Sequence, residues 1–559
     1  VKRLRHMVAV SPRVAHRYIL AETERRPMDY VYDDDGNLTG RHEEYMSQVW
    51  KYFRGVSQTG LKPTTEESFP WSQRLDPATL PVNGEPKYEL GGDFTKETFD
   101  ECVKSMPGFK APGPDETANE FIKHLPEHHL DTLHDMFQSC WKLRRTPPSW
   151  KHSATCLLYK KDDPYEIKNH RPIGLLKSIY KLWTSTITKA ASEYLESRNM
   201  LHDSQHGSRC QRNCAQLFLK LRMAIEDANM TKQQMQVLYV DFSNAYGSID
   251  HQRLFLIMRH MGCPEDLIEL TEDLWNGQTT TIMTPRGNTD PVPFSGKGVI
   301  QGDTLSPLLF IIFMDPLLRW LDAGNRGYKF GTSTAKLGQG GYVDDLFMAT
   351  GNCTDLTTQL RKVDEFGRWA GICLNVDRTR KNKTAFTALA FTTDHKRELE
   401  WLQGELATYQ TGGPPQTVPY LGPNEAYPYL GVHMCMNLSW VSHNRKLKSA
   451  IARKATAIAG SKATAFQKRR MIEQILKPAI RYSMPTANLA ATDVAALDST
   501  LMAAVRKTHG LPSNGCPSLP LLLPKTENGA DLESIETIYA TVLEDTLKMT
   551  LNNDGEMGT

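Results

Sequence analysis

The sequence lacks several features that would assign it to a special class of protein. Its longest apolar run, Leu308 to Met314, has seven residues and ends at Asp315 and Pro316, which is too short to span a bilayer. The net charge is only +2, and there is neither an internal repeat nor a low-complexity tract. With 40% hydrophobic and 23% charged residues, the composition excludes collagen-like, coiled-coil and mostly disordered chains.

Clustered cysteines are also missing. Of the ten cysteines, only Cys210 and Cys214 lie close together in the sequence, and no second pair follows them. Zinc sites usually take four ligands that come in short sequence clusters. A cysteine-based metal site is therefore not expected, and the scattered thiols favour a reducing compartment.

Charge of one sign is concentrated in one place, although the whole chain is nearly neutral. Residues 441–481 hold eleven Lys and Arg against one acid, Glu473, whereas residues 492–559 hold four Lys and Arg against ten acids. A strongly basic stretch attracts phosphate, although a solvated helix face remains the alternative.

Apolar periodicity predicts one short strand and two helices. Gln236 to Val240 is a β-rich run that favours a buried strand, and Leu305 to Leu321 suits a core helix entered by a turn. Thr354 to Ala370 repeats apolar residues at helical spacing, and Gly371 is placed as a C-cap. Alternating strands and helices of this kind indicate an α+β fold.

Other segments are less regular. We expect helices with one turn before residue 60, with a turn at Asp35-Gly36, and a linker over 60–97. Helical stretches are expected over Lys96 to Met106 and Thr117 to Trp150. Residues 412–428, where eight of seventeen are Gly or Pro, read as irregular.

Three acids stand in settings that acids usually avoid. Asp241 ends the 236–240 strand, and Asp344 and Asp345 lie side by side between apolar β-formers. Adjacent residues of a strand point to opposite faces, so both can serve one site only if a tight hairpin turns there. Three converging carboxylates would repel unless cations neutralise them, and Mg²⁺ takes such oxygen ligands. A simple surface turn at Asp344-Asp345 is the alternative.

The order of short motifs resembles the reverse transcriptases of non-LTR (LINE-like) retrotransposons. The matching segments, in the family's order, are Gly113 to Glu120, Asn169 to Ile173, Tyr180-Lys181, Gln205 to Arg209, Tyr239 to Tyr246, Gly298 to Pro307, Tyr342 to Asp345 and Tyr429 to Val432. The resemblance covers roughly residues 99–480. Asp303, where group II intron enzymes usually have Gly, favours the retrotransposon branch.

The resemblance implies an α+β right-hand polymerase fold, with an antiparallel palm sheet that carries the catalytic carboxylates. It implies fingers over 99–235, a palm over 236–435 and a thumb over 436–515. An N-terminal extension would occupy 1–98, and an acidic tail would occupy 516–559.

The resemblance also implies roles for individual residues. Asp241, Asp344 and Asp345 would be catalytic and would hold two Mg²⁺ ions (or Mn²⁺), with the Phe242 carbonyl as a further ligand. Tyr246 would select dNTPs by colliding with a 2′-hydroxyl. The other nucleotide-binding residues would be Lys160, Lys161, Arg171, Gln301 and Gly302.

Template–primer contacts are implied farther along the chain. Tyr429, Leu430 and Gly431 resemble the primer grip. The basic stretch would lie in two thumb helices broken at Gly460-Ser461, where the following residues would grip the backbone: Arg445, Lys448, Arg453, Lys468, Arg469 and Arg470.

Two positions depart from the family pattern. Arg378 stands where the family has a lysine proposed to protonate pyrophosphate; Lys381 or Lys383 could substitute for it, or Arg378 could only stabilise charge. Gly247 stands where the family commonly has Asp.

By the resemblance, the chain would be an RNA-directed DNA polymerase of a non-LTR retrotransposon. Its partners would be an RNA template, a DNA primer or nicked target DNA, and dNTPs, with no membrane. If the host is eukaryotic, it would act in the nucleus (and cytoplasm). An endonuclease domain is expected upstream, because Tyr32 to Gly55 loosely resembles the linker after such domains. A group II intron-type maturase and an inactive relic that only binds nucleic acid remain alternatives.

Overall fold

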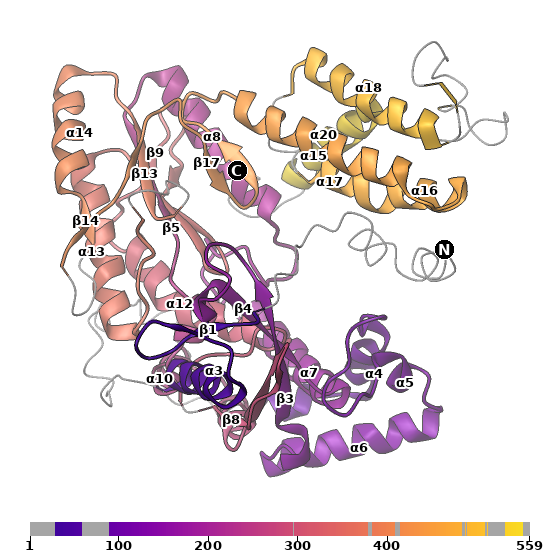
Figure 1. The fold of residues 1–559 in the computed structure, drawn as a ribbon. Coiled ribbons are helices and arrows are strands. Elements are labelled where there is room, and N and C mark those ends of the chain that lie inside the picture. Colours follow the sequence, from indigo (N-terminus) through magenta and orange to yellow (C-terminus); the bar gives the residue numbers. More distant parts are fainter. Residues whose placement is uncertain are drawn as a thin grey trace.

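The computed structural model describes residues 28–58, 89–294, 296–377, 383–408, 414–482, 484, 487, 489–508, 511–512, 522 and 532–551. Residues 1–27, most of the predicted 60–97 linker and most of the start of the acidic tail lie outside these described residues. Figure 1 shows two groups of helices at one side of a mixed sheet-and-helix body.

The N-terminal part is a small hairpin followed by one helix. Strands β1 (Val31–Tyr32) and β2 (Leu38–Thr39) pair in an antiparallel manner around the predicted turn at Asp35-Gly36, and α3 spans His42–Ser57. Tyr45 and Val49 of α3 pack with Ile282 and Val292 of later strands. This segment is therefore built into the body of the protein.

A helical group follows. It contains a 3₁₀ turn at Leu90–Asp93, α4 (Lys96–Ser105), α5 (Asn119–Lys123), α6 (Glu127–Leu143) and the long α7 (Ser178–Ser197). The predicted 117–150 helix is interrupted because Pro126 begins α6 as its N-cap. The core of this helical group is aromatic: Trp183 makes edge contacts with both Phe137 and Trp141.

The first large sheet, here called the N-terminal sheet, has the strand order β4-β3-β6-β7, with β8 also paired to β6. Its strands are β3 (His152–Tyr159), β4 (His170–Leu175), β6 (Thr279–Thr284), β7 (Gly287–Asn288) and β8 (Val292–Pro293). Strands β3 and β6 are parallel, whereas the other pairs are antiparallel. Ser57 of α3 donates a hydrogen bond to the Pro293 carbonyl, 3.1 Å, and so fixes α3 beside β8.

The second large sheet, here called the central sheet, has the order β11-β12-β5-β13-β16. Its strands are β11 (Gln339–Tyr342), β12 (Asp345–Thr350), β5 (Met235–Val240), β13 (Ala385–Leu389) and β16 (Tyr420–Leu421). The expectation of a purely antiparallel sheet is wrong at one edge, since β16 runs parallel to β13. The predicted strand at 236–240 is confirmed.

Strand β5 is buried on both faces, which explains why five of its six residues are apolar. Leu238 and Val240 face one core, formed with α12 (Ser306–Asp322), α13 (Cys353–Ala370), α10 (His251–His260) and α11 (Glu265–Trp275). Val237 and Tyr239 face the other, formed with α8 (Cys214–Thr231).

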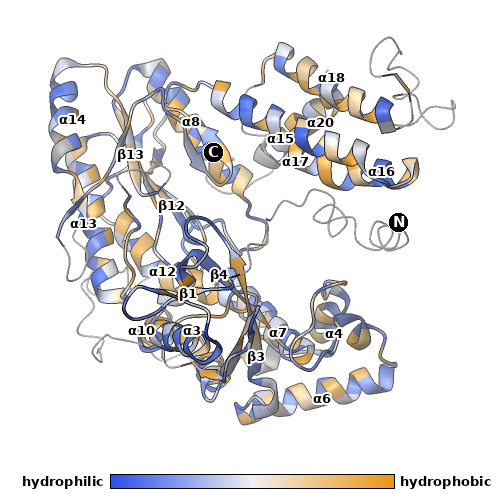
Figure 2. Cartoon of the chain, viewed as in Figure 1, coloured by the Kyte–Doolittle hydropathy of each residue, from blue (hydrophilic) through white to orange (hydrophobic). Residues whose placement is uncertain are grey.

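The two predicted core helices are confirmed as α12 and α13, and Gly371 is the left-handed C-cap of α13. The apolar character of α12 stands out in the hydropathy colouring of Figure 2. Among the described residues, no helix combines the length and apolar character that crossing a bilayer would require.

The Gly- and Pro-rich stretch is more regular than predicted. It contributes β15 (Gln416–Thr417), which pairs with β14 (Ala407–Thr408), and the edge strand β16. It ends in β17 (Tyr427–Tyr429), which forms a hairpin with β18 (Val432–Met434). The remaining elements here are α14 (Thr393–Glu405), the short α9 (Ala245–Ser248) and the β9–β10 hairpin (Tyr328–Lys329 and Lys336–Leu337).

The C-terminal helices form a separate cluster. They are α15 (Val441–Gly460), α16 (Ala465–Met471), a π turn (Ile472–Leu476), α17 (Lys477–Arg481), α18 (Ala491–Thr508) and α20 (Ile535–Leu551). The predicted break after Gly460 is confirmed. The boundary drawn at residue 515 is not structural, because Ile535 and Ile538 of α20 are buried in the same core as Leu497 of α18.

Candidate active site

The three singled-out acids meet at one end of the central sheet. Asp241 directly follows β5, and the turn Val343-Asp344 joins β11 to β12, where Tyr342 pairs with Asp345. Because Leu346 pairs with Val240, Asp345 and Asp241 lie at neighbouring strand ends. Val343 adopts a left-handed φ of 58°, which makes the two-residue turn possible. The predicted tight hairpin is confirmed.

The acids repel one another. Burial, followed by the neighbouring Asp344 and Asp241, raises the pKa of Asp345 to about 7. Burial is also the main cause of the raised pKa of Asp344, to which Asp241 adds. Oxygen donors crowded in this way suit a hard divalent cation, which would relieve their mutual repulsion.

One lysine reaches this carboxylate cluster. Lys383 Nζ lies 2.6 Å from Asp241 Oδ2. The next residue, Thr384, accepts a hydrogen bond from the Asp241 amide through its hydroxyl at 3.2 Å, and the Asn375 amide donates to the Asp241 carbonyl at 2.7 Å. Of the sequence alternatives for the family's lysine, Lys383 is thus at the carboxylates, whereas Arg378 and Lys381 lie outside the described residues.

A pocket of about 930 Å³ opens in front of the carboxylates, and we call it the carboxylate pocket. It brings together all the predicted catalytic and nucleotide-binding residues: Asp241, Phe242, Asp344 and Asp345 with Lys160, Lys161, Arg171, Tyr246, Gln301 and Gly302. Residues from two sheets that are far apart in the sequence therefore form one cavity.

The cationic wall of this pocket comes from the N-terminal sheet. Lys160 follows β3, and Arg171 is exposed on β4. Burial, with the positive charges of Lys383 and Arg171 nearby, lowers the pKa of Lys160. Cations crowded opposite a cluster of acids leave a gap suited to a polyphosphate with bound metal.

Tyr246 forms part of the pocket floor. Its ring stacks on Phe310 of α12, with centroids 5.2 Å apart and planes at 13°. Burial, helped by Asp344, raises the pKa of the Tyr246 hydroxyl to about 12, so the hydroxyl stays protonated. The stack fixes the ring beside the carboxylates.

Gln301 and Gly302 lie where the two sheets approach each other. The Gly174 amide of β4 donates to the Gln301 carbonyl at 2.7 Å. Gly302 has φ +121°, and a Cβ there would lie 2.7 Å from the Gly174 carbonyl oxygen, so a side chain would force the two segments apart. The next residue, Asp303, is buried and accepts a hydrogen bond from Thr184 at 2.6 Å.

The turn that carries Asp344 is held from outside by Gln205. Its Oε1 accepts hydrogen bonds from the amides of Val343 and Gly207, each at 2.9 Å, and its Nε2 donates to the Val343 carbonyl at 3.3 Å. A Cβ on Gly207 would collide with the Val343 amide. Sequence reasoning found this motif by resemblance but missed its role as a positioning element, because the contact spans 138 residues.

The segment that resembles the primer grip, Tyr429 to Gly431, differs in its surroundings from the expectation. Tyr429 is buried, at 2% exposure, and its hydroxyl donates to the Asp345 carbonyl at 3.1 Å. Its side chain therefore supports the carboxylate cluster from the protein interior. The Leu430 carbonyl accepts from Tyr482 at 2.8 Å, and Gly431 is exposed at the hairpin tip.

The basic residues of the C-terminal helices are dispersed. Lys448 pairs with Asp493 at 2.7 Å, and Lys468 donates to the Ala459 carbonyl at 2.7 Å, at the end of α15. Arg445 and Arg453 are exposed on α15, while Arg469 and Arg470 are half-buried on α16. None of the six lines the carboxylate pocket.

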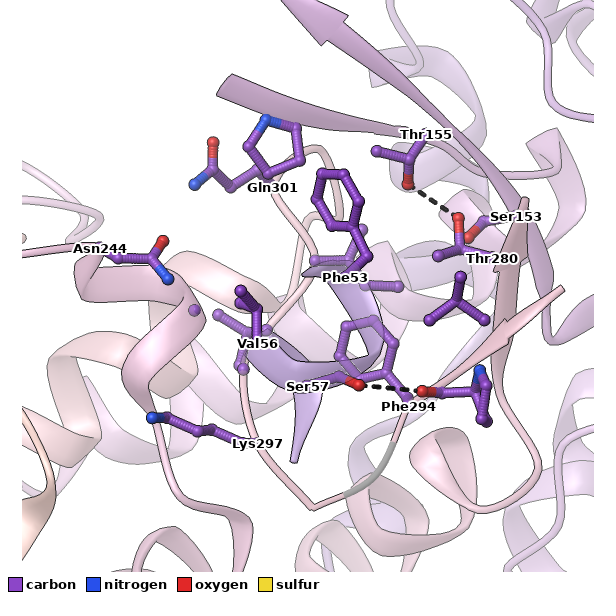
Figure 3. Close-up of a pocket in the computed structure, with 17 residues that line it drawn as sticks. Phe53, Val56, Ser57, Ser153, Thr155, Asn244, Thr280, Phe294, Lys297 and Gln301 are labelled. Atoms are coloured by element: carbon purple, nitrogen blue, oxygen red, sulfur yellow. Dashed lines mark hydrogen bonds between the residues drawn. The ribbon is translucent and has the colours of Figure 1, made fainter. Parts of the chain in front are cut away.

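A second cavity of about 90 Å³ adjoins the carboxylate pocket (Figure 3). Phe53 and Val56 of α3, together with Asn244 and Gln301, line both cavities. Sequence reasoning assigned α3 to an extension and missed that it reaches the site. No local signal in the 42–57 segment specifies its distant partners.

Comparison with known proteins agrees with this geometry. Residues 158–434 match the family described as "Reverse transcriptase (RNA-dependent DNA polymerase)". The chain contains a reverse transcriptase domain. The matched residues include Arg171 on β4, Asp241 directly after β5, and Asp345 at the start of β12.

Similar curated proteins come from mobile elements. The chain is 26% identical over 218 residues to "Probable RNA-directed DNA polymerase from transposon BS" of Drosophila melanogaster, which covers 39% of this chain and 24% of that protein. It is 26% identical over 296 residues to "RNA-directed DNA polymerase from mobile element jockey" of Drosophila funebris, covering 50% and 31%.

A longer match, 22% identical over 390 residues, is with the "Retrovirus-related Pol polyprotein from type-2 retrotransposable element R2DM" of Drosophila melanogaster; it covers 67% of this chain and 35% of that protein. The aligned parts thus make up between about a quarter and about a third of these relatives' own length. The predicted resemblance of the reverse transcriptase domain to those of LINE-like elements is confirmed.

Proposed function

We propose that the chain is an RNA-directed DNA polymerase of a non-LTR retrotransposon, which extends a DNA 3′-hydroxyl on an RNA template with dNTPs. The observation that carries the proposal is the carboxylate pocket, in which three converging acids face Lys160 and Arg171. Nucleotidyl transfer needs little covalent chemistry from the protein and depends on positioning and on charge stabilisation.

Each side of the pocket has a part in this reaction. The 3′-hydroxyl loses its proton to solvent as its oxygen forms a bond to the α-phosphorus, and the bond from the α-phosphorus to the leaving pyrophosphate breaks. Asp241, Asp344 and Asp345, with the Phe242 carbonyl, would hold two Mg²⁺ ions, which activate the 3′-hydroxyl and neutralise the phosphate charge when bound. Arg171, with Lys160 or Lys161, binds the triphosphate oxygens. Lys383, which lies beside Asp241, would meet the departing pyrophosphate.

The other pocket residues select and seat the nucleotide. The fixed ring of Tyr246 would collide with a 2′-hydroxyl, which favours dNTPs. Gln301 and the backbone at Gly302 lie against the nucleotide and the template base. In the right-hand description, the N-terminal sheet with α4 to α7 forms the fingers, the central sheet forms the palm and the C-terminal helices form the thumb.

The thumb residues Arg445, Arg453, Arg469 and Arg470 are proposed to contact the template–primer backbone. Such contacts read shape and charge and carry no sequence information. We propose an RNA template and a DNA primer or nicked target DNA as the partners, in the nucleus and cytoplasm of a eukaryotic cell.

Primer extension on an RNA template with dNTPs and Mg²⁺ tests the proposal. The unmodified chain is expected to make DNA product, and Asp344→Ala is expected to make none. The matched control is Asp290→Ala, which removes an exposed acid from the loop before β8 and should leave the product unchanged. Equal product from the unmodified chain and Asp344→Ala would overturn the site, because the activity would then come from elsewhere. No product from either, with template–primer binding retained, would favour a maturase or a relic.

A further inference from the structure

A second group of potential metal ligands lies at the end of the central sheet opposite to the carboxylates. Strand β12 begins at Asp345 and ends at Thr350, and Cys353 then opens α13. His395 and Glu398 are in the first turns of α14. Ligand atoms of Cys353, His395 and Glu398 all lie within 4.8 Å of one another.

His395 points a buried, unsatisfied nitrogen into this group. Its side chain has 0% exposure. Nε2 lies 2.8 Å from the Gln236 amide nitrogen, whereas Nδ1 has no hydrogen bond of good geometry in the described part of the chain. Nδ1 instead lies 3.6 Å from the Glu398 carboxylate. A buried polar atom without a partner costs free energy, which a bound ligand would recover.

The three donor types narrow the identity of the ligand. Thiolate, imidazole and carboxylate together are the donors of Zn²⁺ and similar borderline-soft ions, whereas Mg²⁺ prefers oxygen ligands only. We propose that Cys353, His395 and Glu398 bind one Zn²⁺-class ion, with water at the fourth position, and that the ion ties α14 to the start of α13.

Local structure supports this assignment. His395 and Glu398 are three residues apart and so share one face of α14. Cys353 is the first residue of α13, so its Sγ lies in the turn where that helix begins. Glu398 is 60% exposed, so it can move the short distance that tetrahedral coordination requires, and the ion can enter from solvent.

A supporting shell is also present. With a metal on Nδ1, His395 carries its proton on Nε2, which must then donate a hydrogen bond. Gln236 can accept it through its carboxamide oxygen after a half-turn of the amide group, while its NH₂ meets the Thr350 hydroxyl that now lies 3.1 Å from Oε1. The buried neighbours of His395 thus fit the metal-bound form.

This site is distinct from the carboxylate pocket. Gln236 and Asp241 lie at opposite ends of β5, which at a rise of about 3.3 Å per residue separates them by about 17 Å. Of these two sites, the carboxylate pocket offers oxygen donors, whereas the proposed site would place a thiolate on the metal. The two sites can therefore be tested separately, and the metal site does not rest on the proposed polymerase activity.

Titration of the chelator-treated full chain with Co²⁺ tests the proposal. We expect a near-ultraviolet thiolate-to-cobalt charge-transfer band that saturates at one equivalent and disappears when Zn²⁺ is added. Cys353→Ser should abolish the band. Cys102→Ser, which changes an equally buried cysteine of α4, is the matched control and should retain it.

Glu398→Gln guards against misfolding of the buried variant, because Glu398 is exposed and its replacement should fold. It should weaken Zn²⁺ binding at least about tenfold, since even changes to residues that only hydrogen-bond a metal ligand cost that much. Absence of the band in the unmodified chain, or its persistence in Cys353→Ser, would overturn the proposal. So would unchanged Zn²⁺ affinity in Glu398→Gln.

Discussion

The acids of the central sheet and the basic residues of the C-terminal helices show opposite relations between sequence and space. Asp241 is far from Asp344 and Asp345 in the sequence, yet the three share one pocket. Lys448 and Lys468 belong to one dense basic stretch, yet Lys448 pairs with Asp493 and Lys468 binds the end of α15. The basic residues are thus clustered in the sequence but dispersed in the structure, whereas the acids are dispersed in the sequence but lie together in the structure.

The difference indicates which charged residues are available to bind a ligand. Like charges held together without equal compensation destabilise the folded chain, and a bound ion or substrate would relieve that cost. Charges already paired within the chain contribute to the fold, and less of their electrostatic attraction is available to bind a partner. Substitutions should therefore have opposite effects on stability in the two regions. At the carboxylates they should stabilise the folded chain and abolish its activity. At the paired lysines they should destabilise the folded chain with little effect on activity.

The largest effect is expected at Asp345. Asp345→Asn keeps the shape but removes one of three crowded charges, so the thermal midpoint of the Mg²⁺-free protein should rise. Primer extension should fall about a thousandfold, which corresponds to about 4 kcal/mol of lost transition-state stabilisation. Thermal unfolding with a chelator and single-turnover extension measure the two effects. A variant that is both destabilised and inactive would break the comparison.

A buried acid beside the pocket should give a pH-dependent stability. Burial raises the pKa of Asp303 to about 6, although hydrogen bonds from Thr184 and from backbone amides, and the charge of Lys181, oppose the shift. The folded state then holds a proton that the unfolded state has lost, so stability falls as the pH rises from about 4 to about 6.

Asp303→Asn abolishes this loss of stability. The free energy of unfolding of the variant should therefore exceed that of the unmodified chain by near zero at pH 4 and by about 3 kcal/mol at pH 7. Urea unfolding across this pH range measures the advantage. The exposed Asp290→Asn should show no such growth, and a constant difference for Asp303→Asn would contradict the explanation.

Gln205 should affect the rate more than the fold. Gln205→Ala removes two hydrogen bonds to Val343 and one to the Gly207 amide. Asp344 then loses its fixed position, so kcat should fall by up to about a hundredfold with KM little changed. Gln359→Ala is the matched control, because Gln359 also makes a buried hydrogen bond, 3.0 Å to the Leu321 carbonyl, away from the turn. Equal losses of kcat in both variants would assign Gln205 a merely structural role.

Tyr246 should affect selectivity more than rate. Tyr246→Ala removes the ring stacked on Phe310, so discrimination of dNTPs over rNTPs, measured as the ratio of kcat/KM values, should fall at least about tenfold. Tyr246→Phe keeps the ring and should keep the discrimination. Loss of selectivity in the Phe variant would mean that the hydroxyl, and not the ring, performs the selection.

The smallest effects are expected in the C-terminal helices. Arg445→Ala should weaken template–primer binding and reduce the slope of log affinity against log salt by about one. Lys448→Ala should change that slope little and should cost at most about 1 kcal/mol of stability, because its partner is Asp493. Binding at several salt concentrations measures both variants, and an equal change of slope would remove the distinction between the two regions.

Local signals predicted the parts of the fold that depend on local pattern. Strand β5, helices α12 and α13 and the hairpin at Asp344-Asp345 follow from apolar periodicity and from the cost of placing acids in strands. Residues whose role depends on distant packing could not be predicted. Tyr429 was assigned to primer contact but is buried beneath Asp345, and β16 formed within a stretch read as irregular.

The candidate sites show the same limit. The carboxylate pocket was predicted because each of its segments keeps a recognisable order of residues. The approach of α3 through Phe53 and Val56 has no such signature. The Cys353 group was missed because its ligands come from two helices whose proximity depends on the packing of α13 against α14, and sequence spacing carries no trace of that contact.

The left-handed Val343 turn has a consequence for attempts to improve this protein by laboratory evolution. A β-branched residue at φ 58° is strained by about 1–3 kcal/mol, and Gly or Asn there would release that strain. A library selected for heat resistance alone would thus be drawn toward replacing Val343. Asn favours the same left-handed turn, whereas Gly also admits other backbone conformations in which the two aspartates would be less fixed. Any such selection must therefore score product as well as survival.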